Sequence, residues 1–306
     1  MSRLKFTIGI LLLFFSVRIK AQDFPYHYFT HFNPMVNNPA LAAVDTKMNA
    51  NVANYNLWAG GFRPLNDYLI SLSIPVEFKK NKRRTLFQPS VGLGVVLLHG
   101  NIGPFNQNIF QLIYSYHIPV SRTTLLSFGI NGIVENIGID VNSLSPLQRD
   151  DPRILTGNNN SFLFDGGFGS SISGNDYRIS FSALNLAPGV FKFKNSLAED
   201  IREYRKFFLS GKYSFKLSKR FLFQPELTLR NTIQNKFAFD SVFDVDFSHF
   251  SVGAGYRSEH TVFIFTKLNV RDFVFTYTSE NPISSNHMIG NGHTFSLGWS
   301  FDMQNR

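Results

Sequence analysis

The sequence predicts an all-β protein that crosses a lipid membrane as a closed barrel of about fourteen antiparallel strands, an even number as such barrels require. Three observations predict this fold. From residue 48 onward, short runs alternate apolar and polar residues. The connections between the runs are alternately short and long, and the chain contains 34 phenylalanines, which suit a lipid-facing surface with aromatic girdles. Lipid offers no hydrogen bonds to the backbone, so only helices and closed barrels can span it.

The N-terminus predicts export. Arg3 and Lys5 precede an apolar run over residues 8–17, and the small Ala21 stands at the expected cleavage position. This pattern is typical of a secretory signal peptide over residues 1–21. A transmembrane anchor is the alternative, but the run is too short to cross a bilayer comfortably, and no other run of about 18 apolar residues follows. We expect a lead segment over residues 22–47 and one barrel over residues 48–306.

Composition excludes several classes of function. The chain has no cysteine, which excludes disulfides, thiol nucleophiles and thiolate metal sites. Its formal net charge is +9, of which four positive charges lie in the signal peptide. The remaining basic residues are dispersed and form no nucleic-acid motif, so we expect no nucleic-acid partner.

Strand boundaries follow from the alternation. We expect strands over residues 48–58, 67–78, 88–99, 106–119, 122–134, 162–173, 176–187, 206–217, 220–231, 238–247, 248–257, 260–269, 272–279 and 292–303. A charge at the bilayer midplane costs about 2–4 kcal/mol, less for a carboxylate, so the polar face of each strand should point into the lumen. The charged residues predicted to face the lumen are Lys212, Glu226, Arg230, Asp240, Asp244, Asp246 and Lys267.

We expect these lumenal aspartates to pair with Arg230, Lys212 or Lys267. A soluble β-sandwich is the alternative fold, and it would bury the apolar face against a second sheet. The number of strands and the export signal favour the membrane.

Connection lengths predict an outer-membrane orientation with both termini in the periplasm, because such barrels have short periplasmic turns and long external loops. The long external loops are expected at 135–161, 188–205 and 280–291, and the second of them has a run over 198–203 that could form one or two helical turns. One inside connection is long and basic, with Lys79, Lys80, Lys82, Arg83 and Arg84. It is a candidate docking surface for a periplasmic partner, or alternatively a solvated turn attracted to anionic lipid.

The lead segment carries two Asn-Pro steps, in Phe32-Asn33-Pro34 and Asn38-Pro39-Ala40. A residue before proline avoids the helical conformation, so these steps predict a turned, rigid path. The aromatic residues before them need burial. The lead is therefore an ordered segment packed beneath or inside the barrel, or a plug or docking element for a partner.

This stretch resembles the start of the PorP/SprF family of the type IX secretion system of Bacteroidota. The family opens its mature chain with Phe-Asn-Pro, three residues and Asn-Pro-Ala, which Phe32-Asn33-Pro34 and Asn38-Pro39-Ala40 match in spacing. Looser matches follow along the whole mature chain at Trp58, 114–116, 127–129, Tyr204, 211–213, 253–257 and 292–293. Two departures concern the subfamily: Ala43 stands where the family often has glycine, and Thr294 where it often has an acidic residue.

The resemblance implies a barrel integral to the outer membrane that takes part in type IX secretion. Some members export or retain a large surface adhesin by receiving its β-rich C-terminal domain, and others are parts of the secretion machine linked to periplasmic components. The lipid and lipopolysaccharide of the outer membrane would surround the barrel. No member is expected to be an enzyme.

The sequence also shows no motif of a catalytic or cofactor-binding site. Ser210-Gly211-Lys212 lacks the flanking residues of a phosphate loop, and no Gly-x-Ser-x-Gly nucleophile elbow exists. The eight histidines show no metal-ligand spacing, so we expect neither cofactor nor metal. The alternative function is a porin or uptake channel, because fourteen strands can enclose a passage. Inward Phe208, Phe263 and Phe265 would then suit small or apolar solutes.

Overall fold

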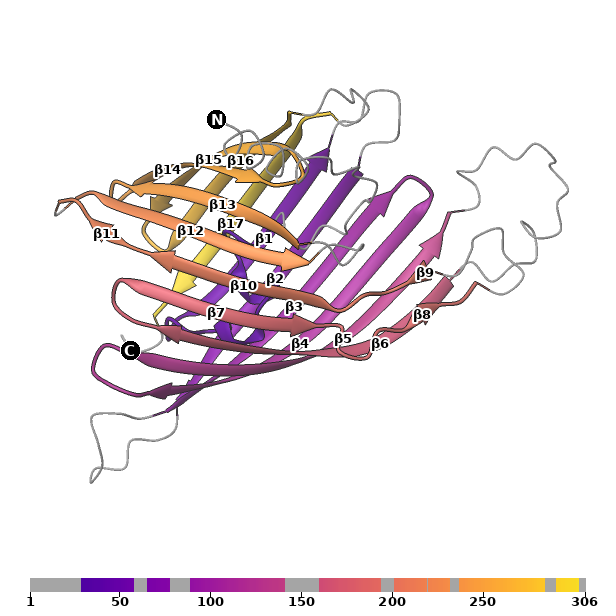
Figure 1. Ribbon diagram of the computed structural model, residues 1–306, viewed down its shortest axis with the longest axis horizontal. Helices are drawn as coiled ribbons and strands as arrows, with labels where there is room; N and C mark the ends of the chain where they lie inside the picture. Colours follow the sequence, from indigo (N-terminus) through magenta and orange to yellow (C-terminus); the bar gives the residue numbers. More distant parts are fainter. Residues whose placement is uncertain are drawn as a thin grey trace, which may run out of the picture.

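The computed structural model describes residues 29–57, 65–77, 89–140, 160–193, 201–218, 220–231, 237–283 and 290–302. Within them, fourteen antiparallel strands form one closed barrel, as the sequence predicts (Figure 1). No helix in this part of the chain is long and apolar enough to cross a membrane.

The barrel strands overlap every predicted run. They are β1 (Met48–Leu57), β2 (Leu65–Glu77), β3 (Ser90–Ile102), β4 (Phe105–Pro119), β5 (Leu125–Ile139), β6 (Asn160–Ser173), β7 (Tyr177–Leu184), β10 (Lys206–Tyr213), β12 (Leu222–Asn231), β13 (Phe237–Asp246), β14 (Phe250–Arg257), β15 (Thr261–Val270), β16 (Phe273–Pro282) and β17 (Gly292–Phe301). Three further strands are short: β8 (Val190–Phe191), β9 (Ile201–Arg202) and β11 (Phe215–Lys216).

Two pairings close the sheet. Each barrel strand pairs with its neighbours in the chain, and β1 pairs with β17 from Met48↔Phe301 to Leu57↔Gly292. The other half of the ring is joined where β10 pairs with β12, from Phe208↔Arg230 to Lys212↔Glu226. β11 continues β10 after Ser214 and pairs with the start of β12. A closed ring leaves no sheet edge to meet lipid.

The side chains of β4 show how the sequence specifies the two faces. Leu112 and Tyr114 point outward and are 54% and 45% exposed, whereas Gln111 and Ser115, which flank them, point inward and are 0% exposed. A protein in water would reverse this arrangement, because apolar surface is stabilised by leaving water. The exposed apolar exterior and the polar interior are therefore those of a barrel surrounded by lipid.

One end of the barrel carries the long loops, and we call it the long-loop end. Toward this end, the outward side chains become polar along one row that runs across neighbouring strands. Adjacent pairings join His293 to Asn56, Asn56 to Asn66, Asn66 to Asn101 and Asn101 to Asn106. The next row contains Asn54, His99 and Asn108, and His99 Nδ1 lies 2.7 Å from Asn108 Oδ1. These rows mark where the apolar exterior ends on this side of the barrel.

The structure differs from the expected strand bounds and helical turns at three places. The connection after β3 is a two-residue turn at Gly103-Pro104, where Gly103 has a positive φ of 58°, although it lies at the long-loop end. β5 begins at Leu125 rather than at residue 122, because residues 120–124 form a turn closed by Val120 N donating to Thr124 O at 2.9 Å. Ile201–Arg202 is not helical: it is β9 and pairs with β8.

Candidate functional site

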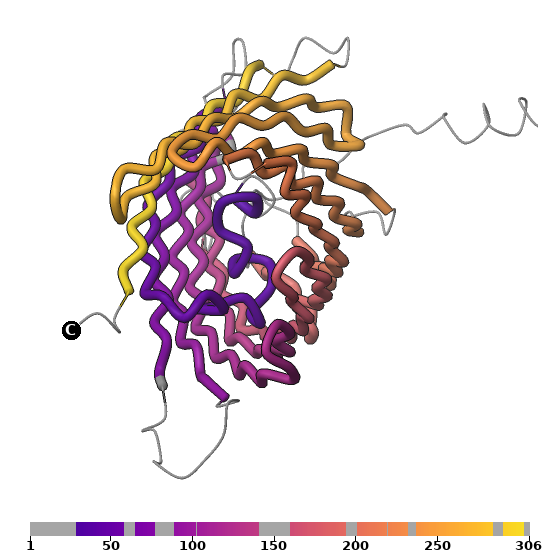
Figure 2. The backbone as a smooth tube through the Cα atoms, turned by 90° about the vertical axis from the view of Figure 1, so that its left-hand side faces the viewer, coloured from indigo at the N-terminus to yellow at the C-terminus, as the bar shows by residue number. Residues whose placement is uncertain are grey.

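Residues 29–47, which precede β1, lie inside the barrel (Figure 2). We call residues 29–47 the lumenal segment, and Figure 2 shows it as an indigo tube enclosed by the ring of strands. Phe29, Val36, Ala40 and Ala42 have no exposed surface. Phe29, Met35 and Val36 pack with inward side chains of β1 to β5, including Tyr55, Leu69 and Ile133. The segment is thus the core of a lumen whose walls are largely polar.

Each Asn-Pro step starts a single 3-10 turn, η2 (Pro34–Val36) and η3 (Pro39–Leu41). Proline suits this first position because its φ is already fixed near the helical value and its missing N–H is not needed there. Asn33 and Asn38 cap the two turns in non-helical conformations, and the Asn38 side chain accepts a hydrogen bond from Ala40 N at 3.0 Å. The spacing of the motif therefore encodes two consecutive tight turns.

The same asparagines fasten the segment to separate parts of the wall. Asn33 Nδ2 donates to Ser71 Oγ on β2 at 2.6 Å. Asn38 Nδ2 donates to the backbone oxygens of Ser170 on β6 and Phe181 on β7 at 3.3 and 3.2 Å. An asparagine amide can donate and accept at once, so Asn38 caps its own turn and bridges two strands. No aspartate could make both sets of bonds.

Glycines on the wall provide the space for this contact. A Cβ atom at Gly129 would lie 2.3 Å from the Pro39 carbonyl carbon and 2.4 Å from Ala40 N. A Cβ at Gly169 would lie 2.1 Å from Asn38 Oδ1, and one at Gly92 would lie 2.2 Å from Ala42 O. Side chains at these positions would displace the segment, so the barrel wall and the motif are complementary in shape.

The end of η3 is held by a buried polar cluster on β4. Ser115 Oγ donates to Ala42 O at 2.9 Å, and His117 Nε2 lies 2.9 Å from the same oxygen. His117 Nδ1 lies 2.8 Å from Ser127 Oγ on β5. The next residue, Ala43, has φ of 51°, in the left-handed region that favours glycine.

His31 is enclosed by aromatic rings and cations. Its ring centroid lies 5.0 Å from that of Phe265 and 5.9 Å from that of Phe263, and its Nε2 lies 3.4 Å from Thr278 Oγ1 on β16. Burial, followed by the positive charges of Lys267, Arg257 and Lys212, holds the pKa of His31 well below its ordinary value. His31 is therefore neutral at neutral pH.

Ion pairs line the lumen beside His31. Arg230 contacts Asp240 at 3.2 Å and Glu259 at 2.5 Å. Lys267 Nζ lies 2.6 Å from Asp244 Oδ2 and 4.8 Å from the centre of the Phe265 ring. Two of the expected carboxylate pairs are thus present, Arg230 with Asp240 and Lys267 with Asp244.

The remaining predicted lumenal charges lie on β10, β12 and β13 and make no such pair among the described residues. Asp246 accepts a hydrogen bond from Ser248 N at 2.7 Å and so caps the β13–β14 turn, which contradicts its expected pairing. Lys212 on β10 stands directly opposite Glu226 on β12, without an ion pair between them. Residues Lys79, Lys80, Lys82, Arg83 and Arg84 lie outside the described part of the chain.

Sequence reasoning missed the most buried pair. Arg257 on β14 contacts Glu280 on β16 at 2.7 Å, and each side chain is 3% exposed. Arg257 also lies over the Phe263 ring, 4.5 Å from its centre. The alternation along β14 places Arg257 on the inward face, so its orientation could be predicted from the sequence. Its partner could not be predicted, because β14 and β16 are not adjacent and meet only through the curvature of the barrel.

Little space remains beside these groups. Phe208, Phe263 and Phe265 are inward and buried, as expected for the apolar side of the lumen. The cavity that Phe208 and Phe263 share with Thr30, His31 and Arg257 has a volume of only about 20 Å³. The lumenal segment therefore occupies the path that these phenylalanines would offer to a solute.

The profile of the type IX secretion system membrane protein PorP/SprF family matches residues 19–301. The chain belongs to this family. PorP/SprF membership and the barrel place the protein in the outer membrane, in a role related to type IX secretion. The motif residues Phe32, Asn33, Pro34, Asn38, Pro39 and Ala40 are thus, in this PorP/SprF protein, the residues that turn through the lumen. No match was found among curated proteins.

Solved structures share the fold. The CymD monoaromatic hydrocarbon channel is 9% identical, with a TM-score of 0.51, and the match covers 92% of this chain and 94% of the channel. The Ralstonia pickettii toluene transporter TbuX is 8% identical, with a TM-score of 0.52, and the match covers 87% and 92% of the two chains. At this identity the likeness shows the barrel architecture alone.

Proposed function

We propose that this PorP/SprF protein is a non-enzymatic outer-membrane component of type IX secretion that receives and anchors the C-terminal domain of a secreted surface adhesin. The family supports a secretion role, and neither the family nor the fold is that of a known enzyme. The barrel would sit among the lipid and lipopolysaccharide of the outer membrane. Its secretion partners would be the adhesin domain outside and type IX machinery in the periplasm.

The filled lumen carries this proposal. The lumenal segment is hydrogen-bonded to β2, β4, β6 and β7. The chain itself therefore occupies the interior of the barrel. A channel would need that space for its solute. A barrel that is filled in this way offers its partners its two ends, and the long-loop end is the one that faces the cell exterior.

The long-loop end has a built surface suited to a β-rich domain. β8 and β9 form a two-stranded sheet separate from the barrel, paired at Val190↔Arg202 and Phe191↔Ile201. Phe191 and Phe193 pack with Ile137 at the end of β5, and Ile201 packs against this cluster. The hairpin is therefore fixed to the barrel rim. A short sheet held outside the barrel can accept an added strand from a partner.

The test is affinity purification of the tagged protein from native outer membranes in mild detergent, followed by mass spectrometry. We expect recovery of one large secreted protein, or its C-terminal fragment, in nearly equal amounts. Ile201→Pro removes a backbone donor from β9 and should reduce this recovery at normal barrel levels. Ile201→Val keeps the strand and the apolar contact, and it should recover the partner as the wild type does.

Three results would count against parts of the proposal. A solitary barrel would overturn the anchor function. Recovery of periplasmic machine components alone would make the protein part of the secretion apparatus instead. Ion conductance by the intact protein in planar bilayers would favour the alternative function, a porin or uptake channel. Charge reversal at Lys82, Arg83 and Arg84 tests the proposed periplasmic docking surface separately, by loss of periplasmic partners only.

A further inference from the structure

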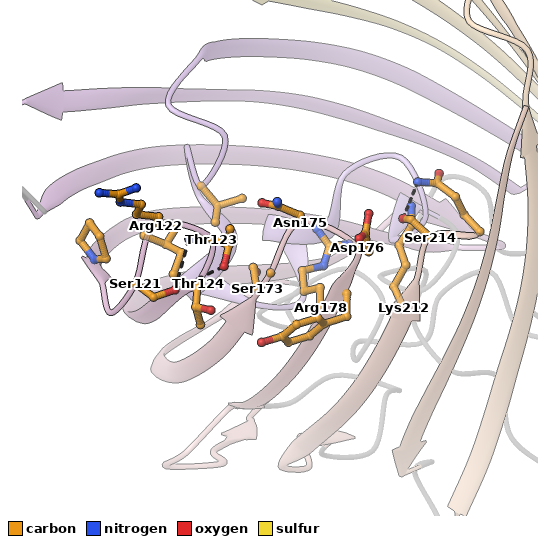
Figure 3. A pocket seen from close by; sticks show the side chains of 16 residues that line it. Ser121, Arg122, Thr123, Thr124, Ser173, Asn175, Asp176, Arg178, Lys212 and Ser214 are labelled. Carbon is orange, nitrogen blue, oxygen red and sulfur yellow. Dashed lines mark hydrogen bonds between the residues drawn. The ribbon is translucent and has the colours of Figure 1, made fainter. Parts of the chain in front are cut away.

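A second cavity opens at the short-turn end of the barrel, which the orientation of outer-membrane barrels places in the periplasm. Its volume is about 490 Å³, and it is lined by the β4–β5 and β6–β7 turns, by β10 and by Val44 of the lumenal segment. Figure 3 shows its labelled side chains, which include the three cations Arg122, Arg178 and Lys212. The cavity shares no lining residue with the small cavity beside His31, although the charge of Lys212 also acts on His31.

The charges in this cavity are not balanced. Arg178 on β7 and Lys212 on β10 stand directly opposite one another in the strand register. Neither makes a hydrogen bond or an ion pair with any described residue. Among the described residues that line the cavity, Asp176 carries the one carboxylate, and it lies 2.7 Å from Lys216 Nζ and is already paired. Glu226 is opposite Lys212 on its other side and offsets one of the positive charges at most.

Two like charges directly opposite on neighbouring strands destabilise a sheet. Elsewhere in this lumen, buried cations are matched to carboxylates, as in the Arg257–Glu280 and Lys267–Asp244 pairs. The unmatched cations are at the open end, where a ligand can reach them. Hydroxyl groups of Ser121, Thr123 and Ser214 lie around them and can complete the hydrogen bonding of an anionic group.

We propose that this cavity binds an acidic segment of a periplasmic polypeptide, whose carboxylates pair with Arg178 and Lys212. Arginine binds carboxylates in a forked, two-bond geometry, and lysine adds a point charge beside it. The volume lies in the range of roughly 300–1,000 Å³ typical of sites for small organic ligands, which suits a short peptide better than a single inorganic ion. Occupation would also cancel the repulsion between the two cations.

The experiment measures fluorescence anisotropy of labelled tetraglutamate with the purified full-length protein in detergent. We expect tetraglutamate to bind at least tenfold more tightly than labelled tetraglutamine, with an affinity that falls as salt rises. The double variant Arg178→Gln/Lys212→Gln should bind tetraglutamate at least tenfold more weakly. The matched control is Arg220→Gln, which removes one exposed charge from the neighbouring turn outside the cavity and should change affinity less than twofold.

A second variant keeps the cations in place. Thr123→Glu puts a carboxylate in an exposed turn at the cavity and should compete with the peptide, lowering its affinity without altering the barrel strands. The proposal is overturned if the double variant and Thr123→Glu both bind tetraglutamate as the wild type does. It is also overturned if inorganic phosphate displaces tetraglutamate at concentrations below the dissociation constant of the peptide, because the site would then be one for a small anion.

Discussion

Adding one methyl group to the barrel wall should release the lumenal segment. Gly129→Ala would place a Cβ atom 2.3 to 2.5 Å from the backbone of Pro39 and Ala40. Backbone atoms cannot turn aside as the end of a flexible side chain can, so the segment has to move by about an ångström, the shortfall from ordinary contact at about 3.5 Å. Gly132→Ala on the same strand is the matched control, because its Cβ would meet nothing within 4 Å.

The expected cost follows from the clash. Overpacking of a well-packed interior by one methyl group costs about 1–3 kcal/mol. This cost falls on the bound state of the segment and not on the strand pairing of β5. With tenfold for each 1.4 kcal/mol, the open fraction of the segment should rise about 5- to 150-fold.

A single-cysteine reporter makes this opening measurable. The natural chain has no cysteine, so Val36→Cys creates one thiol at a position that is fully buried in the lumen. The rate of maleimide labelling of this thiol in purified, folded barrels reports how often the segment opens. We expect slow labelling in the Val36→Cys parent and in the version that also carries Gly132→Ala, and labelling about 5- to 150-fold faster with Gly129→Ala.

One result would refute the reasoning. If Gly129→Ala and Gly132→Ala barrels are equally folded and label Val36→Cys at the same slow rate, the wall glycines do not seat the segment. Circular dichroism and heat-modifiable gel mobility establish that both barrels are folded before labelling is compared.

Three other predictions concern buried charge. Because its folded pKa lies below the ordinary value of about 6.5, His31 favours the closed segment above that pH and opposes it as protonation begins. The Val36→Cys labelling rate, divided at each pH by the labelling rate of free cysteine to correct for the thiolate fraction, should therefore rise as pH falls below about 6.5, and His31→Gln should abolish that rise. Arg257→Met alone leaves Glu280 buried and unpaired and should lower the free energy of unfolding in urea by about 3–5 kcal/mol, whereas adding Glu280→Gln should recover most of the loss. Both carboxylate oxygens of Asp67 are buried without a hydrogen-bond partner among the described residues. Asp67→Asn should therefore raise the unfolding free energy at pH 8 by about 1–3 kcal/mol, and a loss of stability would instead indicate that a cation or proton satisfies this group.

The strand pattern was predictable because the two faces of every strand meet different surroundings, lipid on the outside and the polar lumen on the inside. Phe221, Phe223, Leu227 and Leu229 can only face lipid, and the alternation along β12 then places Glu226 on the lumenal side. Register errors of one residue would exchange the two faces, so the alternation specifies pairing strongly. The PorP/SprF motif likewise predicted a turned lead, because two Asn-Pro steps exclude a continuous helix.

The contacts inside the barrel were not predictable in the same way. Asn38 bonds to Ser170 and Phe181, more than 130 residues away in the chain, and no periodicity encodes such a meeting. The pairing of Arg257 with Glu280 depends on the curvature that brings alternate strands together. The β8–β9 hairpin was missed because each strand has two residues, too few to show alternation.

The β1–β17 seam has a consequence for biogenesis. These strands come from opposite ends of the barrel sequence, so the cylinder is completed only when the last strand has been synthesised and exported. The lumenal segment enters the chain before β1, and most of its hydrogen-bonded partners lie on β2 to β7. The first half of the sheet can thus curl around the segment while it is still open on one side. In that order of assembly the segment would be enclosed when β1 and β17 pair, and it would not have to be threaded into a closed barrel.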